Sequence, residues 1–283
     1  MIYYMDLCYA LGNDAAIQIA VSIAGSVEEF ASLMNKKAEE LRLQNTHFIT
    51  PHGLDENEHY TTAYELAIIA DYALNIDKIC QVVKTKTYSV TINNNPKTIT
   101  NTNELLGYLD GVEGVKTGFT NGAGRCLVTS VDRNDFNIIT VVLGADTKKI
   151  RTRDSIKLIE YIYSNYELID LEEIIEEEFH NWSKINKNRI CIYKGKKQKI
   201  DIELENYKYK IYPVKKDSVK DVNIEFKNLN MYFEAPVYKY TSIGNLILNI
   251  GNENLMNIRI ITSESIERKE IRDYFFDCIK TIV

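Results

Sequence analysis

The chain opens with the pattern of a pair of amphipathic helices. Apolar residues over 14–24 fall on one side of a helix, which Gly25 ends. Ser26 then starts a second helix, and Glu29 follows it at the spacing of a capping box, in which side chains satisfy free backbone N–H groups. The apolar stripe of this second helix consists of Phe30, Leu33, Met34, Ala38 and Leu41. Both patterns predict helices that bury one face.

Two further helices are predicted before the spacing of the apolar residues changes from that of a helix to that of a strand. Thr62 and Glu65 have capping-box spacing at the start of a helix that is predicted to reach about residue 74, and a shorter helix is predicted over 77–83. Beyond them, polar and apolar side chains alternate in two short runs, 88–92 and 97–100, which flank a turn that contains Asn and Pro. This pattern predicts a β-hairpin.

A glycine-rich strand and a second hairpin follow. Residues 111–119 have the sequence Gly-Val-Glu-Gly-Val-Lys-Thr-Gly-Phe, and the β-rich runs 125–132 and 136–143 are joined by a turn signal. An amphipathic helix is predicted over 154–163. Residues 1–165 therefore predict an α+β domain, an antiparallel sheet with helices packed on it.

The rest of the chain divides into three predicted parts. Residues 166–180 are strongly acidic and predict a linker, and 181–262 contain short β-runs typical of a small all-β sandwich. Residues 263–283 end in a helix whose apolar face consists of Ile271, Phe275, Cys278, Ile279 and Ile282. Periodicity leaves two interpretations open for this helix: docking on its own domain, or lying in a membrane interface.

Composition narrows the classes of function. Apolar residues make up 45% of the chain and charged residues 26%, with a net charge of −6, which indicates a globular protein and argues against a nucleic-acid partner. The five cysteines form no CxxC pair, so no zinc site or redox dithiol is expected. No run reaches the roughly 18 apolar residues of a membrane-spanning helix, and the N-terminus carries no export-signal pattern.

The tripeptide Lys116-Thr117-Gly118 has a chemical logic on a strand. Lysine supplies a positive charge for an anionic substrate terminus, and threonine adds a hydroxyl donor beside it. Glycine lets a substrate backbone approach the strand and pair with it. The tripeptide is a weak signal alone, but its glycine-rich flanks and the hairpin after it make it a much stronger one.

With these flanks, 111–144 resembles the serine D-alanyl-D-alanine carboxypeptidases, the low-molecular-mass penicillin-binding proteins of peptidase family S11. The stretches 12–16 (Gly-Asn-Asp-Ala-Ala) and 46–54 (Thr-His-Phe-Ile-Thr-Pro-His-Gly-Leu) are similar to further parts of that family. The resemblance implies an incomplete penicillin-binding-protein/β-lactamase-like domain, then a small β-domain and a C-terminal amphipathic helix. The activity it implies is removal of the terminal D-alanine from a peptidoglycan stem peptide through an acyl-serine intermediate.

The resemblance also implies a set of substrate-binding residues: Asn13, Lys116, Thr117, Gly118, Phe119 and Arg151. Asn13 is expected to hold the substrate amide, and the backbone N–H of Phe119 to serve as an oxyanion-hole donor. Arg151, placed just before the predicted helix, falls where the family has an arginine near the substrate carboxylate, with Arg153 as the competing choice. A solvated surface arginine is the plain alternative, and no cofactor or metal is implied.

Two of the family's three motifs are incomplete in these 283 residues. Leu11 stands where the serine of Ser-x-Asn is expected, and no serine is followed three positions later by lysine. That spacing matters because one helical turn brings the lysine amine beside the serine oxygen. We therefore expect an N-terminally truncated member with no catalytic residue intact. Three hypotheses follow: the chain is part of an active carboxypeptidase lineage, a non-catalytic protein that binds peptidoglycan or a partner, or the product of a decayed gene that folds poorly because missing strands expose apolar edges.

The four histidines do not suggest another catalyst. His47 and His52 lie in the 46–54 stretch, where a loop-structuring role is expected, and His180 and Trp182 are expected to be packing residues. The resemblance implies two contacts: a stem peptide ending in D-Ala-D-Ala and, through the terminal helix, a membrane surface. It places the family outside the cytoplasmic membrane, whereas the chain as printed carries no signal peptide.

Overall fold

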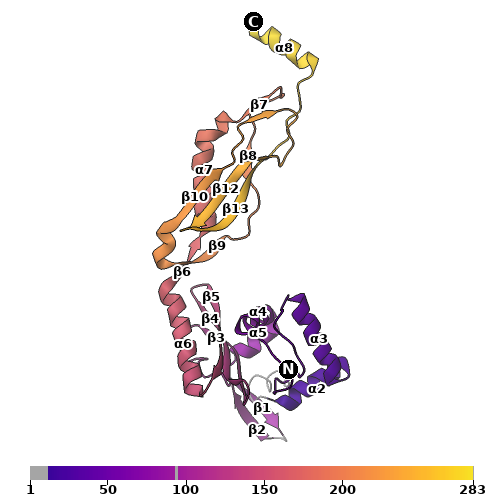
Figure 1. Cartoon of the computed structure of the whole chain (residues 1–283), viewed down its shortest axis with the longest axis vertical. Helices are drawn as coiled ribbons and strands as arrows, with labels where there is room; N and C mark the ends of the chain where they lie inside the picture. Colours follow the sequence, from indigo (N-terminus) through magenta and orange to yellow (C-terminus); the bar gives the residue numbers. More distant parts are fainter. Residues whose placement is uncertain (1–11, 93–94, 283) are drawn as a thin grey trace. The chain divides into compact units, whose positions relative to one another are not determined.

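The computed structural model describes residues 12–92 and 95–282 and divides the chain into two compact units. The boundary lies between Ser164 and Asn165. Each unit is built from its own elements (Figure 1). Leu11 lies outside the described residues.

The described part of the first unit begins with the helices α2 (Asn13–Ala24), α3 (Val27–Glu40), α4 (Ala63–Leu74) and α5 (Asp77–Lys84). Gly25 ends α2 in the left-handed conformation with φ of 87°, which glycine adopts without steric cost. The side chains of Ser26 and Thr62 cap their helices, because Ser26 accepts the N–H of Glu29 and Thr62 accepts the N–H of Glu65. The helical pattern of the sequence is therefore confirmed.

The strands of the first unit are β1 (Thr87–Ile92), β2 (Asn95–Thr100), β3 (Val112–Thr120), β4 (Gly124–Arg133) and β5 (Phe136–Ala145). β1 and β2 form the predicted hairpin, and β3, β4 and β5 form an antiparallel sheet in that order. Helix α6 (Lys148–Asn165) packs on this sheet, where Leu105, Leu127, Val131 and Ile159 are buried together. The expected α+β layering is confirmed.

Helix α6 begins earlier than the 154–163 pattern predicted. Thr147 accepts the backbone N–H of Ile150 through its side chain and that of Arg151 through its carbonyl, so it caps the helix before the amphipathic stripe begins. Arg151 is consequently inside the helix and not just before it.

The expectation of an acidic linker over 166–180 is wrong. This segment forms β6 (Tyr166–Asp170) and most of α7 (Leu171–Asn186), and Asp170 caps α7 by accepting the N–H of Glu173. Leu171 and Ile175 are fully buried in the second unit. The acidic residues cover the outer side of an amphipathic helix. The segment resembles a linker in composition, but its apolar residues recur at the spacing of a helix.

The second unit contains β7 (Cys191–Tyr193), β8 (Ile202–Leu204), β9 (Ile211–Lys215), β10 (Val222–Lys227), β11 (Tyr232–Glu234), β12 (Ser242–Ile250) and β13 (Glu253–Thr262), with short 3-10 helices at Lys187–Arg189 and Lys216–Asp221. Its largest sheet has the order β10-β12-β13-β8, while β11 pairs with β7 and β6 with β9. The β-domain is confirmed, with α7 packed against it as an unpredicted helix.

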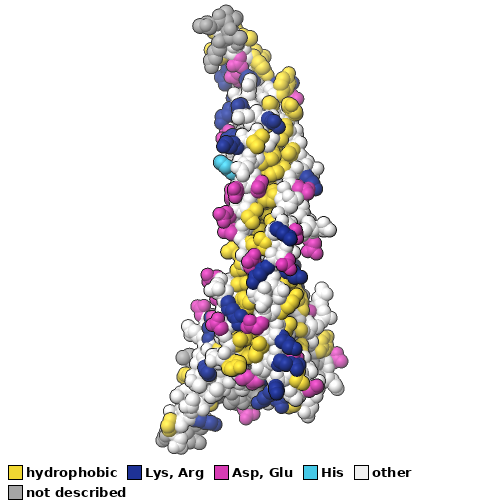
Figure 2. Space-filling model, turned by 90° about the vertical axis from the view of Figure 1, so that its left-hand side faces the viewer, with side chains coloured by type: hydrophobic (Ala, Val, Ile, Leu, Met, Phe, Trp, Pro, Cys, Tyr) yellow, Lys and Arg dark blue, Asp and Glu magenta, His cyan; other side chains and the backbone are white. Residues whose placement is uncertain are grey.

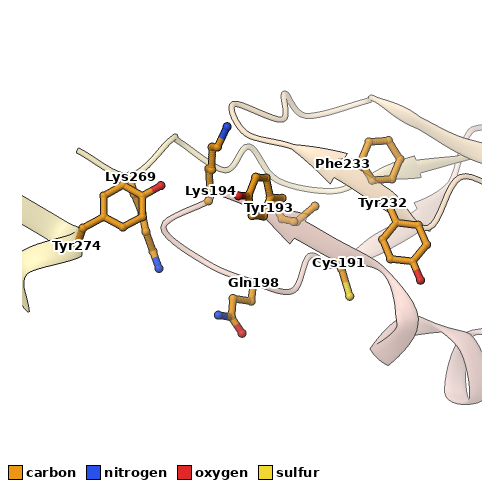
Figure 3. Close-up of a pocket in the computed structure, with 10 residues that line it drawn as sticks. Cys191, Tyr193, Lys194, Gln198, Tyr232, Phe233, Lys269 and Tyr274 are labelled. Atoms are coloured by element: carbon orange, nitrogen blue, oxygen red, sulfur yellow. The ribbon is translucent and has the colours of Figure 1, made fainter. Parts of the chain in front are cut away.

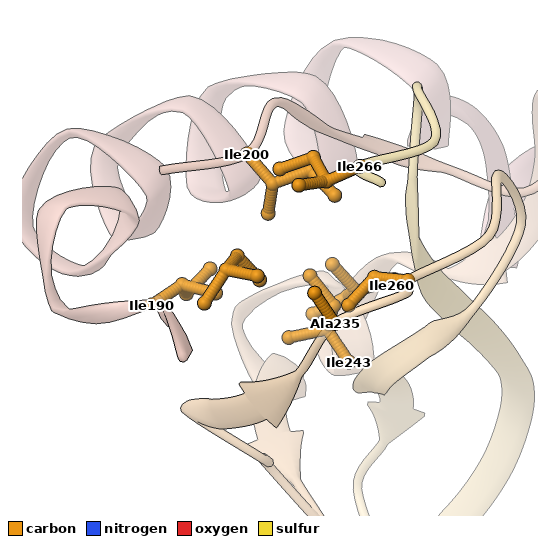
Figure 4. Packing of buried hydrophobic residues seen from close by; sticks show 8 residues of the cluster. Ile190, Ile200, Ala235, Ile243, Ile260 and Ile266 are labelled. Carbon is orange, nitrogen blue, oxygen red and sulfur yellow. The ribbon is translucent and has the colours of Figure 1, made fainter. Parts of the chain in front are cut away.

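The core of this unit is rich in isoleucine. Figure 4 shows buried side chains from several segments meeting one another: Ile190, Ile200, Ala235, Ile243, Ile260 and Ile266. Trp182 stacks on Phe226 with ring centroids 4.8 Å apart, so the packing role predicted for Trp182 is confirmed. His180 is exposed, so the packing role predicted for it is wrong.

Helix α8 (Ile271–Ile282) follows the β-domain, and its described apolar side chains are exposed. Ile271 is 90% exposed and Phe275 65%, so the interpretation of a helix docked on its own domain is wrong. Among the described residues no single helix has the length and apolarity needed to cross a membrane, although α2 and α3, bent by 83°, pass that test as a pair. On the face shown in Figure 2, basic and acidic side chains are mixed over both units.

Candidate functional site

The motif Lys116-Thr117-Gly118 lies on β3, at the edge of its sheet. Within the part of the chain that the structure describes, β3 pairs with β4 and with no other strand. Lys116 lies opposite Val128 and Gly118 opposite Cys126, so these two residues share one face of the sheet while Thr117 belongs to the other. We call the side of β3 away from β4 the β3 edge. An edge strand presents backbone N–H and C=O groups that a second extended chain can pair with.

Two short hydrogen bonds order the motif. The Lys116 ammonium donates to the Thr117 carbonyl at 2.6 Å, and the Thr117 hydroxyl donates to the Thr102 hydroxyl at 2.7 Å. Thr117 is only 7% exposed, whereas Lys116 is half-buried. The lysine charge is thus held beside the strand backbone and not extended into solvent.

Gly118 has more free space around it than Gly114 in β3 or Gly111 just before the strand. A Cβ at Gly111 would lie 2.3 Å from the carbonyl oxygen of Asp132, and one at Gly114 would lie 3.0 Å from Val83, so both glycines are required by internal packing. A Cβ at Gly118 would meet only Cys126, at an ordinary 3.6 Å. Nothing within the described fold therefore requires glycine at 118, and its absent side chain leaves space over the strand for a ligand backbone.

Phe119 continues the strand with an exposed ring. The ring is 46% exposed, and the Arg125 guanidinium lies over it with 3.6 Å between the guanidinium carbon and the ring centroid. This cation–π contact places a positive charge next to the motif. The role expected for the Phe119 backbone N–H stays a prediction.

Asp55 fastens the 46–60 loop to the turn after β3. Its carboxylate accepts the backbone N–H of Gly122 at 3.1 Å. Hydrogen bonds from Thr120 and from Gly122 lower the pKa of Asp55. The C-terminal end of β3 is thereby held by a loop that lies far from it in the sequence.

The histidines of that loop hold its backbone. His47 bonds through Nδ1 to the Glu58 carbonyl at 2.7 Å, and Nδ1 of His52 accepts the N–H of Leu54. The predicted loop-structuring role of both residues is confirmed. His59 does the same through Nδ1, which accepts the N–H of Ile49 at 2.9 Å, and burial lowers its pKa. Among the described residues no group of three or more His, Cys, Asp or Glu is arranged to hold a metal ion.

Glu65 anchors the start of the same loop. Its carboxylate accepts the backbone N–H groups of Gln44 and Asn45, both at 2.9 Å, and the hydroxyl of Thr46. Burial raises the pKa of Glu65, but these hydrogen bonds outweigh it and the pKa is lowered overall. The capping box predicted with Thr62 is therefore only half formed, because the glutamate side chain serves the loop.

Asn13 and Arg151 lie on other elements than the motif. Asn13 is the first residue of α2 and is half-buried. Arg151 lies within α6, is 3% exposed and forms an ion pair with Glu104 at 2.9 Å, which rules out the alternative of a solvated surface arginine. Its assignment as a carboxylate ligand gains no support from this geometry. Arg153, the competing choice, is exposed and pairs with Asp154 at 2.9 Å.

Residues 101–103 support β3 through side-chain hydrogen bonds, a role that the sequence pattern had not predicted. Thr102 meets the Thr117 hydroxyl, and Asn103, only 2% exposed, donates its side-chain amide to the Gly114 carbonyl at 2.8 Å. Asn101 donates in the same way to the Val83 carbonyl. An Asn-Thr-Asn run after a predicted strand is a turn signal, and it could have identified this segment.

Each of the two units matches the model of a known family or domain. Residues 4–147 match the model of the D-alanyl-D-alanine carboxypeptidase family, and 184–268 match that of the penicillin-binding protein 5 C-terminal domain. The chain is 34% identical to D-alanyl-D-alanine carboxypeptidase DacF of Bacillus subtilis, over 93% of this chain and 65% of that protein. It is 28% identical to DacD of Escherichia coli, over 93% and 66%.

Solved structures agree with this assignment. The D-alanyl-D-alanine carboxypeptidase DacD from Francisella tularensis superposes with a TM-score of 0.72 at 25% identity, covering 95% of this chain and 75% of that one. Penicillin binding protein 5 from Haemophilus influenzae gives 0.69 at 26%, covering 91% and 71%. The chain spans 65% and 66% of the length of the first two curated relatives.

Proposed function

Because the chain belongs to the D-alanyl-D-alanine carboxypeptidase family, we propose that it binds the D-Ala-D-Ala end of a peptidoglycan stem peptide along the β3 edge. The observation that carries this proposal is the open position at Gly118 beside Lys116. A peptide laid along the edge gains main-chain hydrogen bonds, and the lysine charge attracts its terminal carboxylate. Thr117, on the opposite face, supports the strand through its hydroxyl, which donates to that of Thr102.

Binding and turnover are separable in this proposal. Acyl transfer needs a serine activated by a neighbouring base, and the 283 residues contain no Ser-x-x-Lys. We propose that the chain as printed holds the peptide without cleaving it. The alternative is that these residues form part of an active carboxypeptidase, which the greater length of the relatives favours.

Calorimetric titration with a peptide ending in D-Ala-D-Ala tests the binding. We expect saturable binding by the unaltered chain and a loss of about 10- to 100-fold in Lys116→Ala, because a hydrogen bond to a charged group contributes roughly 1.5–3 kcal/mol. Lys97→Ala, an exposed lysine on β2, is the matched control and should bind normally. A folded sample that binds neither this peptide nor its L-Ala-L-Ala counterpart, or binds both equally, contradicts the proposal.

The exposed face of α8 favours a second contact, with a membrane surface. Phe275 and Phe276 are 65% and 59% exposed, and Ile279 is 44% exposed. Apolar side chains on a terminal helix can lie in the headgroup region of a bilayer. We propose that α8 holds the chain on the membrane, on its extracytoplasmic side as the resemblance implies.

Co-sedimentation with phosphatidylglycerol-containing vesicles checks this contact. Phe275→Asp is expected to lower the bound fraction by about tenfold, since a buried phenylalanine contributes roughly 1.5–3 kcal/mol. Tyr238→Ala, an exposed aromatic of the same unit, should sediment like the unaltered chain. Equal sedimentation of Phe275→Asp and the unaltered chain would remove α8 from this role.

A further inference from the structure

A cavity of about 490 Å³ lies at one end of the β-domain, entirely within the second unit. β7, β11 and the start of α8 form its walls, and Figure 3 shows the side chains that surround it. It is separate from the β3 edge, which belongs to the first unit. Neither the proposed peptide binding nor the membrane contact uses it.

Tyrosine rings dominate the lining of this cavity. Tyr193 and Tyr232 are 67% and 78% exposed, and Tyr274 is 44% exposed. In Figure 3 the rings follow one another, with Tyr193 between Tyr274 and Tyr232. Exposed aromatic side chains gathered in a hollow mark a binding surface, and a row of them fits an extended ligand with flat apolar faces.

Each of the two lysines in the lining has a carboxylate partner, although Glu234 also pairs with Arg268 at 3.2 Å. Lys194 pairs with Glu234 at 2.8 Å, and Lys269 pairs with Asp277 at 2.6 Å. Both ammonium groups also lie over tyrosine rings, at 5.0 Å from that of Tyr193 and 5.7 Å from that of Tyr274. With both lysines engaged by carboxylates and rings, the groups that the lining offers to a ligand are the rings, the tyrosine hydroxyls and the Gln198 amide. Such a surface suits a neutral ligand that combines apolar faces with hydroxyl and amide groups.

We propose that this cavity binds a neutral polysaccharide strand that carries acetamido groups. Sugar rings present C–H faces that stack on tyrosine, while the Gln198 amide both donates to and accepts from an acetamido group. The glycan strand of peptidoglycan has this chemistry, and this choice of source rests on the function proposed above. The β-domain would then hold the polymer whose peptide branches the β3 edge receives.

Titration with the β-1,4-linked tetramer of N-acetylglucosamine tests the proposal on the full chain. We expect saturable binding that Tyr193→Ala and Tyr232→Ala each weaken by about fivefold, the size of an aromatic stacking contact. Tyr238→Ala, 68% exposed on the same unit but outside the cavity, should bind normally. The tetramer of glucose, which lacks the acetamido groups, should bind more weakly. Equal binding of the two tetramers, or by the cavity variants and the unaltered chain, overturns the proposal.

Cys191 supplies an independent measure of where the tetramer binds. Its thiol lines the cavity and is exposed, and Cys278 on α8 is also exposed but does not line it. Saturating tetramer should slow iodoacetamide alkylation of Cys191, read by peptide mass mapping, and leave that of Cys278 unchanged. Lys116→Ala should retain tetramer binding, so a failure here is distinguishable from a failure of peptide binding at the β3 edge. Unprotected Cys191 in the presence of bound tetramer would place the ligand elsewhere.

Discussion

Intact-mass spectrometry of the chain after incubation with a penicillin is expected to show only the unmodified mass. Penicillins acylate an activated serine, and activation requires a base within hydrogen-bond reach. No serine in the 283 residues has lysine three positions later. Removing the nucleophile from a serine enzyme lowers its rate by about a million-fold, so acylation should be undetectable in hours.

The measurement needs proof that the sample is folded. Fluorescence of Trp182, the only tryptophan of the chain, provides it, because the indole is stacked on Phe226 in the second unit. Circular dichroism measures the secondary structure of the whole chain, including the first unit. A penicillin-reactive serine enzyme in a parallel tube shows that the penicillin is active. A stoichiometric adduct on a serine peptide would show that one of these serines is activated by a base other than the expected lysine.

Leu246→Ala is expected to destabilise the second unit by about 2–5 kcal/mol. Leu246 lies on β12, is fully buried, and packs with Leu171 and Ile175 of α7. Truncating its side chain removes apolar contacts and leaves a cavity between the sheet and the helix, which close-packed interiors do not fill by relaxation. The loss is large because Leu246 lies at the centre of a cluster that joins the sheet to Leu171 and Ile175 of α7.

Urea unfolding followed by Trp182 fluorescence measures this loss, since the reporter lies in the affected unit. Tyr238→Ala removes an exposed ring of the same unit and should change the free energy of unfolding by less than about 0.5 kcal/mol. A loss below about 1 kcal/mol in Leu246→Ala would mean that α7 does not depend on the sheet for its packing.

Local sequence signals were sufficient wherever the causes were local. The caps at Ser26 and Thr62 form with partners three residues away, and the left-handed end of α2 needs only Gly25. The hairpins and the glycine-flanked strand followed from alternation and turn residues. The resemblance carried by Lys116-Thr117-Gly118 and its flanks indicated the family that the comparisons confirm.

The errors arose where composition concealed a periodic pattern or where a distant partner decided the outcome. The acidic segment 166–180 hides Leu171 and Ile175, four residues apart, which the sheet of the second unit buries. Arg151 was expected just before a helix, with a solvated surface arginine as the alternative, but it lies inside α6, where it is buried and pairs with Glu104. Glu65 had the spacing of a capping box, but the backbone of Gln44 and Asn45 takes its carboxylate.

The sequence by itself determined the order of helices and strands up to α6, the chemistry of the β3 motif and the absence of Ser-x-x-Lys from these 283 residues. These properties depend on residues that are neighbours along the chain, whose spacing fixes their geometry. Only the tertiary structure decided that Gly118 is open while Gly114 is packed, that α8 exposes its apolar face, and that tyrosines from β7, β11 and α8 line one cavity. Each of these depends on contacts between residues far apart in sequence, which no periodicity records.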